Sequence, residues 1–115
     1  MQKQIAVVAA FIALDVITGL VKAFSTGSYR SIKMREGLVH KLTEAIAIAF
    51  GVLADYSLPV IGVSIKFSLF TAMVIYVTVM EAGSIIENIG TINPALGDKL
   101  NSLFKDTGAG GNGSV

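Results

Sequence analysis

The sequence lacks cysteine and tryptophan, contains a single histidine, and has few charged side chains for its 115 residues. The absence of cysteine excludes disulfides, thiolate metal sites and cysteine catalysis, and one histidine excludes a multi-histidine metal site. Charged residues make up 15% of the chain, against about 25% in soluble domains. The net charge of +1 gives no basic footprint for nucleic acid. No catalytic triad, phosphate-binding loop or metal cluster is evident, so we expect a non-enzymatic protein without cofactor or metal.

Apolar residues dominate instead, at 53% of the chain, with a mean hydropathy of +0.71. They form three blocks, at about 5–24, 42–63 and 67–86. Each block has about 20 residues, the length that crosses a hydrocarbon core of about 30 Å. The sequence therefore predicts an all-α, multi-pass membrane protein with spans at about 4–24, 41–57 and 67–88. Charges inside the blocks also leave two or four spans open.

Two other interpretations of the apolar blocks are a soluble helical bundle and a secretory signal peptide. The run from Ile5 to Leu14 is entirely apolar and lacks the polar face of a soluble helix. Asp15 and Lys22 then interrupt the block, and no small-x-small cleavage site precedes the basic segment that follows. We therefore expect the first block to be a retained transmembrane helix.

A basic segment between the first two blocks sets the expected topology. Basic residues near short loops favour the cytoplasmic side, so we expect an outer N-terminus and an inner C-terminus. Part of the segment can be helical, with Ser31 as N-cap, and we expect His40 to be solvated there. Pro59 predicts that the second helix ends near Tyr56 or Ser57. The basic residues are Arg30, Lys33, Arg35 and Lys41.

The C-terminal region predicts a short amphipathic helix at 94–105, opened by Pro94. Its apolar positions share one face, which favours a location at the membrane interface or against a partner. A glycine-rich tail follows at 107–115, and its composition predicts disorder. We expect one membrane domain, 1–106, followed by this tail. The apolar positions are Leu96, Leu100, Leu103 and Phe104.

Each apolar block contains a stripe of polar or small residues at helical spacing. One interpretation is that one small chain cannot shield the acidic members, so copies assemble around the stripes or a shared aqueous lumen. The alternative is local: Lys22 snorkels to the interface, Asp15 makes one structural hydrogen bond, and Glu44 and Asp55 lie at the two interfaces. The stripes are Asp15, Thr18, Gly19 and Lys22; Glu44, Gly51 and Asp55; and Glu81, Ser84 and Asn88, with Glu87 at the boundary.

Several of these residues follow a familiar order and spacing. They include the run ALDVITGLVKAF, the turn at Gly27, and the segment SIIENIG from Ser84 to Gly90. Between and after them come Ser31, Gly37, Leu38, Lys41, Asp55, Glu81, Pro94 and Leu100. Over about residues 13–104 the chain resembles phage holins of the toxin-secretion/phage-lysis type.

The resemblance implies a protein that accumulates in the cytoplasmic membrane of the bacterial host and assembles there with copies of itself. The resulting lesions would depolarise the membrane and let an endolysin reach the cell wall, and some relatives help to release toxins. The residues alone also fit a small ion channel or transporter subunit using Asp15, Asp55 or Glu81. A third hypothesis for the function is a structural membrane protein that anchors a partner through the amphipathic helix.

Overall fold

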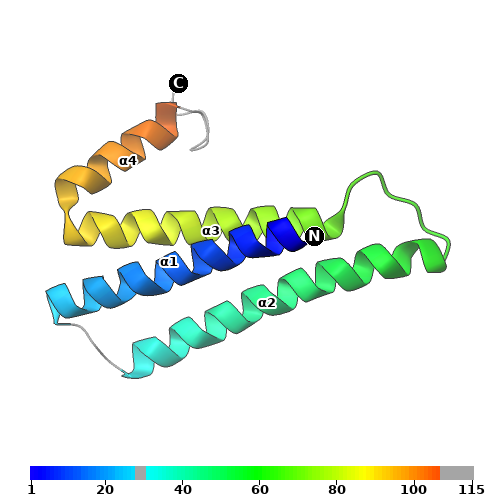
Figure 1. Cartoon of the computed structure of the whole chain (residues 1–115), viewed down its shortest axis with the longest axis horizontal. Coiled ribbons are helices and arrows are strands. Elements are labelled where there is room, and N and C mark those ends of the chain that lie inside the picture. The colour runs from blue at the N-terminus through cyan, green and yellow to red at the C-terminus, as the bar shows by residue number, and fades with distance from the viewer. Residues whose placement is uncertain (28–30, 107–115) are drawn as a thin grey trace.

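The structure is a computed structural model that describes residues 1–27 and 31–106, and within those ranges it contains helices and no strand. Three helices are long and apolar enough to cross a membrane. This confirms the predicted all-α membrane class with a short fourth helix. The predicted tail at 107–115 lies outside the described residues. The helices are α1 (Gln2–Thr26), α2 (Ser31–Val60), α3 (Leu69–Ile92) and α4 (Pro94–Asp106) (Figure 1).

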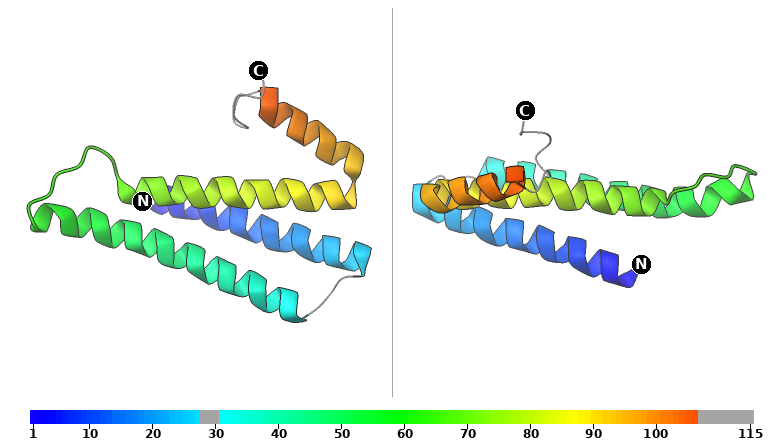
Figure 2. Two further views of the ribbon diagram at one scale, coloured as in Figure 1. Left: turned by 180° about the vertical axis from the view of Figure 1, so that it is seen from behind. Right: turned by 90° about the horizontal axis from the view of Figure 1, so that it is seen from above.

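Helix α3 is the element to which the other helices attach. It packs against α1, α2 and α4. Helices α1 and α3 run in the same direction, α2 runs against both, and α4 turns back from the end of α3 (Figures 1 and 2). Helices satisfy their own backbone hydrogen bonds, which the absence of water in a bilayer core requires. The three long helices are therefore arranged as alternating membrane crossings.

The apolar core is small and lies along one face of α3. Val8 of α1 joins three buried residues of α3, and residues of α2 and α1 pack around them. Most other large apolar side chains are exposed, which suits a surface that faces lipid rather than water. The core residues are Val8, Phe70, Val74 and Val77, with Ile12, Ile48 and Val52 packed against them.

The second helix extends beyond both ends of the predicted span. It begins at Ser31 rather than near 41, so the expected basic loop is largely helical and His40 lies on a helix. Arg30 lies outside the described residues, whereas Lys33 and Arg35 are exposed on the first turns of α2. The hydropathy pattern missed these turns because they are polar, although their residues continue the same helix.

The prediction that Pro59 ends the second helix near Tyr56 is wrong. The helix continues to Val60, with Pro59 inside it. Proline removes only its own N–H, and so close to the C-terminus this loss affects a single helical bond. The helix ends instead in a Schellman turn, in which the Gly62 N–H bonds to the Pro59 oxygen and the Val63 N–H to the Leu58 oxygen. Gly62 has the positive φ of 87° that this turn requires.

A glycine pair lets α4 fold back on α3. A Cβ atom added to Gly97 would lie 2.4 Å from the Cα of Gly90, so the close approach of the two backbones requires glycine at position 97. The apolar face of α4 then borders a groove that it shares with α1 and α3. Phe11, Leu14, Ile85, Ile89, Leu100 and Leu103 line that groove.

Candidate functional site: a polar network among three helices

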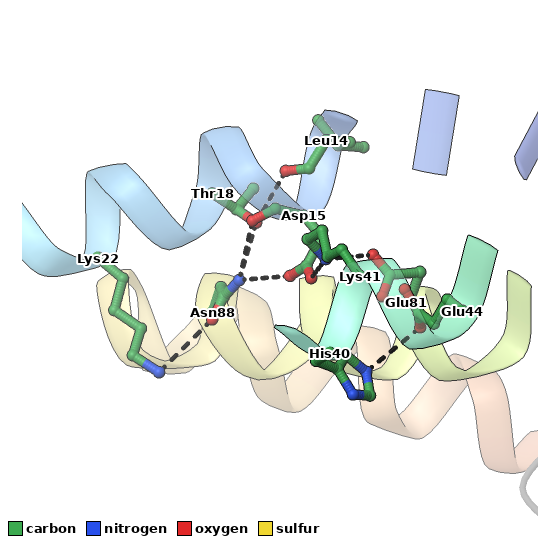
Figure 3. A network of polar contacts seen from close by, with 9 residues as sticks. All are labelled: Leu14, Asp15, Thr18, Lys22, His40, Lys41, Glu44, Glu81 and Asn88. Atoms are coloured by element: carbon green, nitrogen blue, oxygen red, sulfur yellow. Dashed lines mark hydrogen bonds and ion pairs between the residues drawn. The ribbon is translucent and has the colours of Figure 1, made fainter. Parts of the chain in front are cut away.

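One lysine joins the three long helices. The Lys41 Nζ of α2 lies 2.7 Å from Asp15 Oδ2 of α1 and 2.8 Å from Glu81 Oε2 of α3 (Figure 3). The Glu81 side chain has no exposed surface, and those of Asp15 and Lys41 retain less than a fifth. The lysine is therefore a shared counter-ion for two acids that come from different helices.

An asparagine extends this network along α1 and α3. The Asn88 Nδ2 donates to Asp15 Oδ1 at 2.9 Å and to Thr18 Oγ1 at 3.0 Å. Its other amide atom, Oδ1, accepts from Lys22 Nζ at 3.5 Å. Gly19 lies beside the amide, and a Cβ there would make an ordinary contact with Nδ2 at 3.7 Å. Asp15, Thr18 and Lys22 of the predicted α1 stripe thus face α3 (Figure 3).

Asp15 and Glu81 lie midway along α1 and α3, whereas Lys22 and Asn88 lie about one turn from the ends of these helices. At about 1.5 Å of rise per residue, Asp15 and Glu81 are each about 17–20 Å from the ends of their helices. Charged side chains at such a depth are expensive in a bilayer unless they are paired. Removing one partner from a buried ion pair is strongly destabilising, because it leaves an uncompensated charge. We call the set Asp15, Thr18, Lys22, Lys41, Glu81 and Asn88 the central network.

A second acid of α2 borders the central network. Glu44 is 7% exposed, and its Oε2 lies 3.2 Å from the Nε2 of His40, one turn earlier on the same helix. One ligand atom from each of His40, Glu44 and Glu81 lies within 4.8 Å of the other two. In Figure 3, Glu81 stands between Lys41 on one side and Glu44 on the other.

A separate contact joins α2 to the start of α3. Asp55 accepts hydrogen bonds from the backbone N–H groups of Leu69 and Phe70, at 2.7 and 3.0 Å, and from the Ser68 hydroxyl at 2.6 Å. These N–H groups have no partner within their own helix, because they belong to its first turn. The α2 backbone comes close at Gly51, where a Cβ would lie 2.8 Å from the Cα of Phe70. We call these contacts the outer clasp.

The structure brings most of the predicted stripe residues together within one chain. Asp15, Glu81 and Asn88 meet in the central network, and Gly51 and Asp55 form the outer clasp. The premise that a single chain cannot shield its acidic residues is therefore wrong for Asp15 and Glu81. Four predicted residues lie outside both sets. Gly19 and Glu44 border the central network, whereas Ser84 is half-buried and Glu87 is exposed.

The sequence interpretation missed the role of Lys41, which it assigned to the basic loop. The spacing of residues along α2 does indicate this role. Lys41, Glu44, Ile48, Gly51 and Asp55 alternate at spacings of three and four, which places them on one face of α2. Extending the stripe of Glu44, Gly51 and Asp55 by one turn toward the N-terminus finds the lysine that bonds to Asp15 and Glu81.

Comparison with known proteins identifies the class of this membrane bundle. Residues 1–108 match the bacteriophage holin family, and they include all four helices and the central network. No match was found among curated proteins or among solved structures. The matched region covers nearly the whole chain and agrees with three membrane-length helices. The chain belongs to the bacteriophage holin family.

Proposed function

We propose that this chain assembles with copies of itself in the cytoplasmic membrane of the bacterial host and forms lesions there. The lesions depolarise the membrane and let endolysin reach the cell wall. Family membership and three membrane-length helices support this proposal. The observation that carries it is the central network, in which Lys41 pairs with two acids midway along an otherwise apolar bundle.

The central network stabilises a closed form of the single chain. With Asp15, Lys41 and Glu81 paired, the surface offered to lipid is mostly apolar. Moving α2 away would leave these charges in a medium that penalises them. These charges would then have to be stabilised by water or by Asp15, Lys41 and Glu81 of another copy. When two copies exchange helices, each ion pair of Lys41 within one chain is replaced by the same ion pair between chains. A crowded membrane therefore favours assembly, whereas an isolated chain has no partner and stays closed.

The outer clasp directs where the bundle opens. Asp55 and Gly51 hold α2 to the start of α3, whereas the opposite half of α2 depends on the Lys41 contacts. Loss of those contacts therefore frees the N-terminal half of α2 first. That half carries Lys33 and Arg35 on its exposed surface, and the positive-inside rule places such residues on the cytoplasmic side.

Induced expression in bacteria tests the proposed function, with and without a cytosolic endolysin, while turbidity and membrane potential are followed together. We expect sudden depolarisation after a delay and rapid lysis only when endolysin is present. Gradual, ion-selective depolarisation without endolysin release would instead identify a channel. An intact potential at high expression would leave a structural membrane partner as the remaining function.

Two substitutions link that experiment to the central network. Asp15→Leu and Glu81→Leu should shift the time of lysis or abolish it, because each removes an acid that pairs with Lys41. Glu87→Gln is the matched control, since Glu87 is exposed on α3 and lies outside the network. Unchanged timing in both leucine variants would contradict a role for the network in lysis.

A further inference from the structure

We propose that His40, Glu44 and Glu81 form a binding site for one divalent transition-metal ion, with Zn²⁺ as its best-suited occupant. The ion would connect α2 to α3 beside Lys41. Two ligands come from one turn of α2 and the third from the middle of α3. This inference is independent of the lysis function, because it concerns what the closed chain binds.

The spacing of the ligand atoms fits a small metal ion. His40 Nε2 and Glu44 Oε2 are 3.2 Å apart. A tetrahedral zinc ion with bonds of about 2.0–2.1 Å separates its ligand atoms by about 3.3 Å. All three ligand atoms lie within 4.8 Å of one another, so completing such a set brings Glu81 closer by at most about 1.5 Å. Water can fill the fourth position.

Buried carboxylate oxygens that accept no hydrogen bond provide a second, independent observation. Within the described part of the chain they include both oxygens of Glu44 and Oε1 of Glu81. Glu44 Oε2 lies 3.2 Å from His40 Nε2, which is itself a proposed ligand. Glu81 has no exposed surface and Glu44 has 7%. Buried charges in proteins are normally paired or bound to a metal. Lys41 does not fill this role, because it bonds to Asp15 and to the other oxygen of Glu81.

The local charge balance favours a dication. A bound metal ion requires deprotonated carboxylates. In that form Asp15, Glu44 and Glu81 would carry three negative charges, and Lys41 bonds directly to two of them. The two charges left over would match the charge of one divalent ion. The donor set of one imidazole and two carboxylates suits Zn²⁺ and its first-row neighbours rather than ions that require only oxygen. The side chain of His40 is 53% exposed, so one ligand of the proposed set reaches the surface of the bundle.

Cobalt titration of the full-length chain in mild detergent tests the site after chelator treatment, because tetrahedral Co²⁺ absorbs visible light. We expect one Co²⁺ per chain, displaced by Zn²⁺. His40→Ala and Glu44→Gln should each weaken binding at least about tenfold. Glu87→Gln is the matched control, an exposed carboxylate of α3 whose removal should leave the affinity unchanged.

Far-ultraviolet circular dichroism of each variant verifies that the helices persist, and His40→Ala is the safer variant because that side chain is half-exposed. No Co²⁺ binding by the folded native chain would overturn the proposal. Equal affinity in the native chain, His40→Ala and Glu44→Gln would overturn it too, because the ion would then bind at another place. Neither result depends on lysis, so the site and the proposed function can fail separately.

Discussion

The central network and the outer clasp neutralise acidic side chains in different ways. Glu81 lies in the middle of α3 and pairs with the side chain of Lys41. Asp55 lies near the end of α2 and binds backbone N–H groups at the start of α3. A helix offers free N–H groups only in its first turn, since the later ones already bond within the helix. Depth along the bundle therefore decides which kind of partner an acid can find.

The two regions also differ in what replaces a lost contact. At the outer clasp, water can reach the helix end and satisfy the N–H groups that Asp55 leaves. At the central network, a carboxylate that loses Lys41 remains buried among apolar helices. The comparison therefore predicts that the same kind of substitution has a much larger effect at the centre than at the clasp.

The largest effect is expected for Lys41→Met. It leaves Asp15 and Glu81 buried without a cation and should destabilise the chain by about 3–5 kcal/mol. Lys33→Met is the matched control, because Lys33 is exposed on the same helix. The free energy of unfolding in mild detergent measures the difference. Equal stability of the two variants would remove the distinction between the centre and the surface.

Gly51→Ala should have the next largest effect. Its Cβ would lie 2.8 Å from the Cα of Phe70, so α2 and α3 must move apart at the outer clasp. Overpacking of this kind typically destabilises by about 1–3 kcal/mol. Gly37→Ala is the matched control on the same helix, where an added Cβ has no neighbour within 4 Å. That control should raise the melting temperature slightly, whereas a fall in both would point to a general effect of α2 glycines.

Asp55→Ala should have the smallest effect of the three. It removes the acceptor for two N–H groups of α3, which water can partly replace. We expect a lower melting temperature than in the native chain, but a smaller drop than in Gly51→Ala. Asp55→Asn keeps one of the two accepting oxygens and should recover part of the loss. An asparagine variant as unstable as the alanine variant would show that the α3 N–H groups need both carboxylate oxygens.

Much of this fold is evident in the sequence, because three apolar blocks and one amphipathic segment specify four helices. The inward faces of α1 and α3 are also predictable, since polar residues recur at helical spacing on each of them. These residues are Asp15, Thr18 and Lys22 on α1, and Glu81 and Asn88 on α3. Periodicity shows which face of a helix carries the polar residues, but it does not show which neighbouring helix that face contacts. For this reason the stripes suggested contacts between copies, where the structure has contacts within one chain.

The ends of α2 were the least predictable part, for two physical reasons. The first turns are polar, so hydropathy does not distinguish them from a loop, and it predicts Lys41 at the start of the second span rather than inside a longer helix. Pro59 acts as a helix breaker in the middle of a helix but is tolerated in the last turn, where Gly62 ends α2. His40 and Glu44 lie on the same helix, α2. Their closeness to Glu81 depends on how α2 packs against α3, which the sequence alone does not show.

The central claim is that Lys41 stabilises the bundle by compensating Asp15 and Glu81. Unfolding of the triple variant Asp15→Asn, Lys41→Met and Glu81→Gln, compared with Lys41→Met alone, tests it most directly. Neutral side chains need no cation, so we expect the triple variant to regain most of the stability that Lys41→Met loses. Residues that interact deviate from additivity, whereas independent residues do not. A triple variant less stable than Lys41→Met would contradict the account.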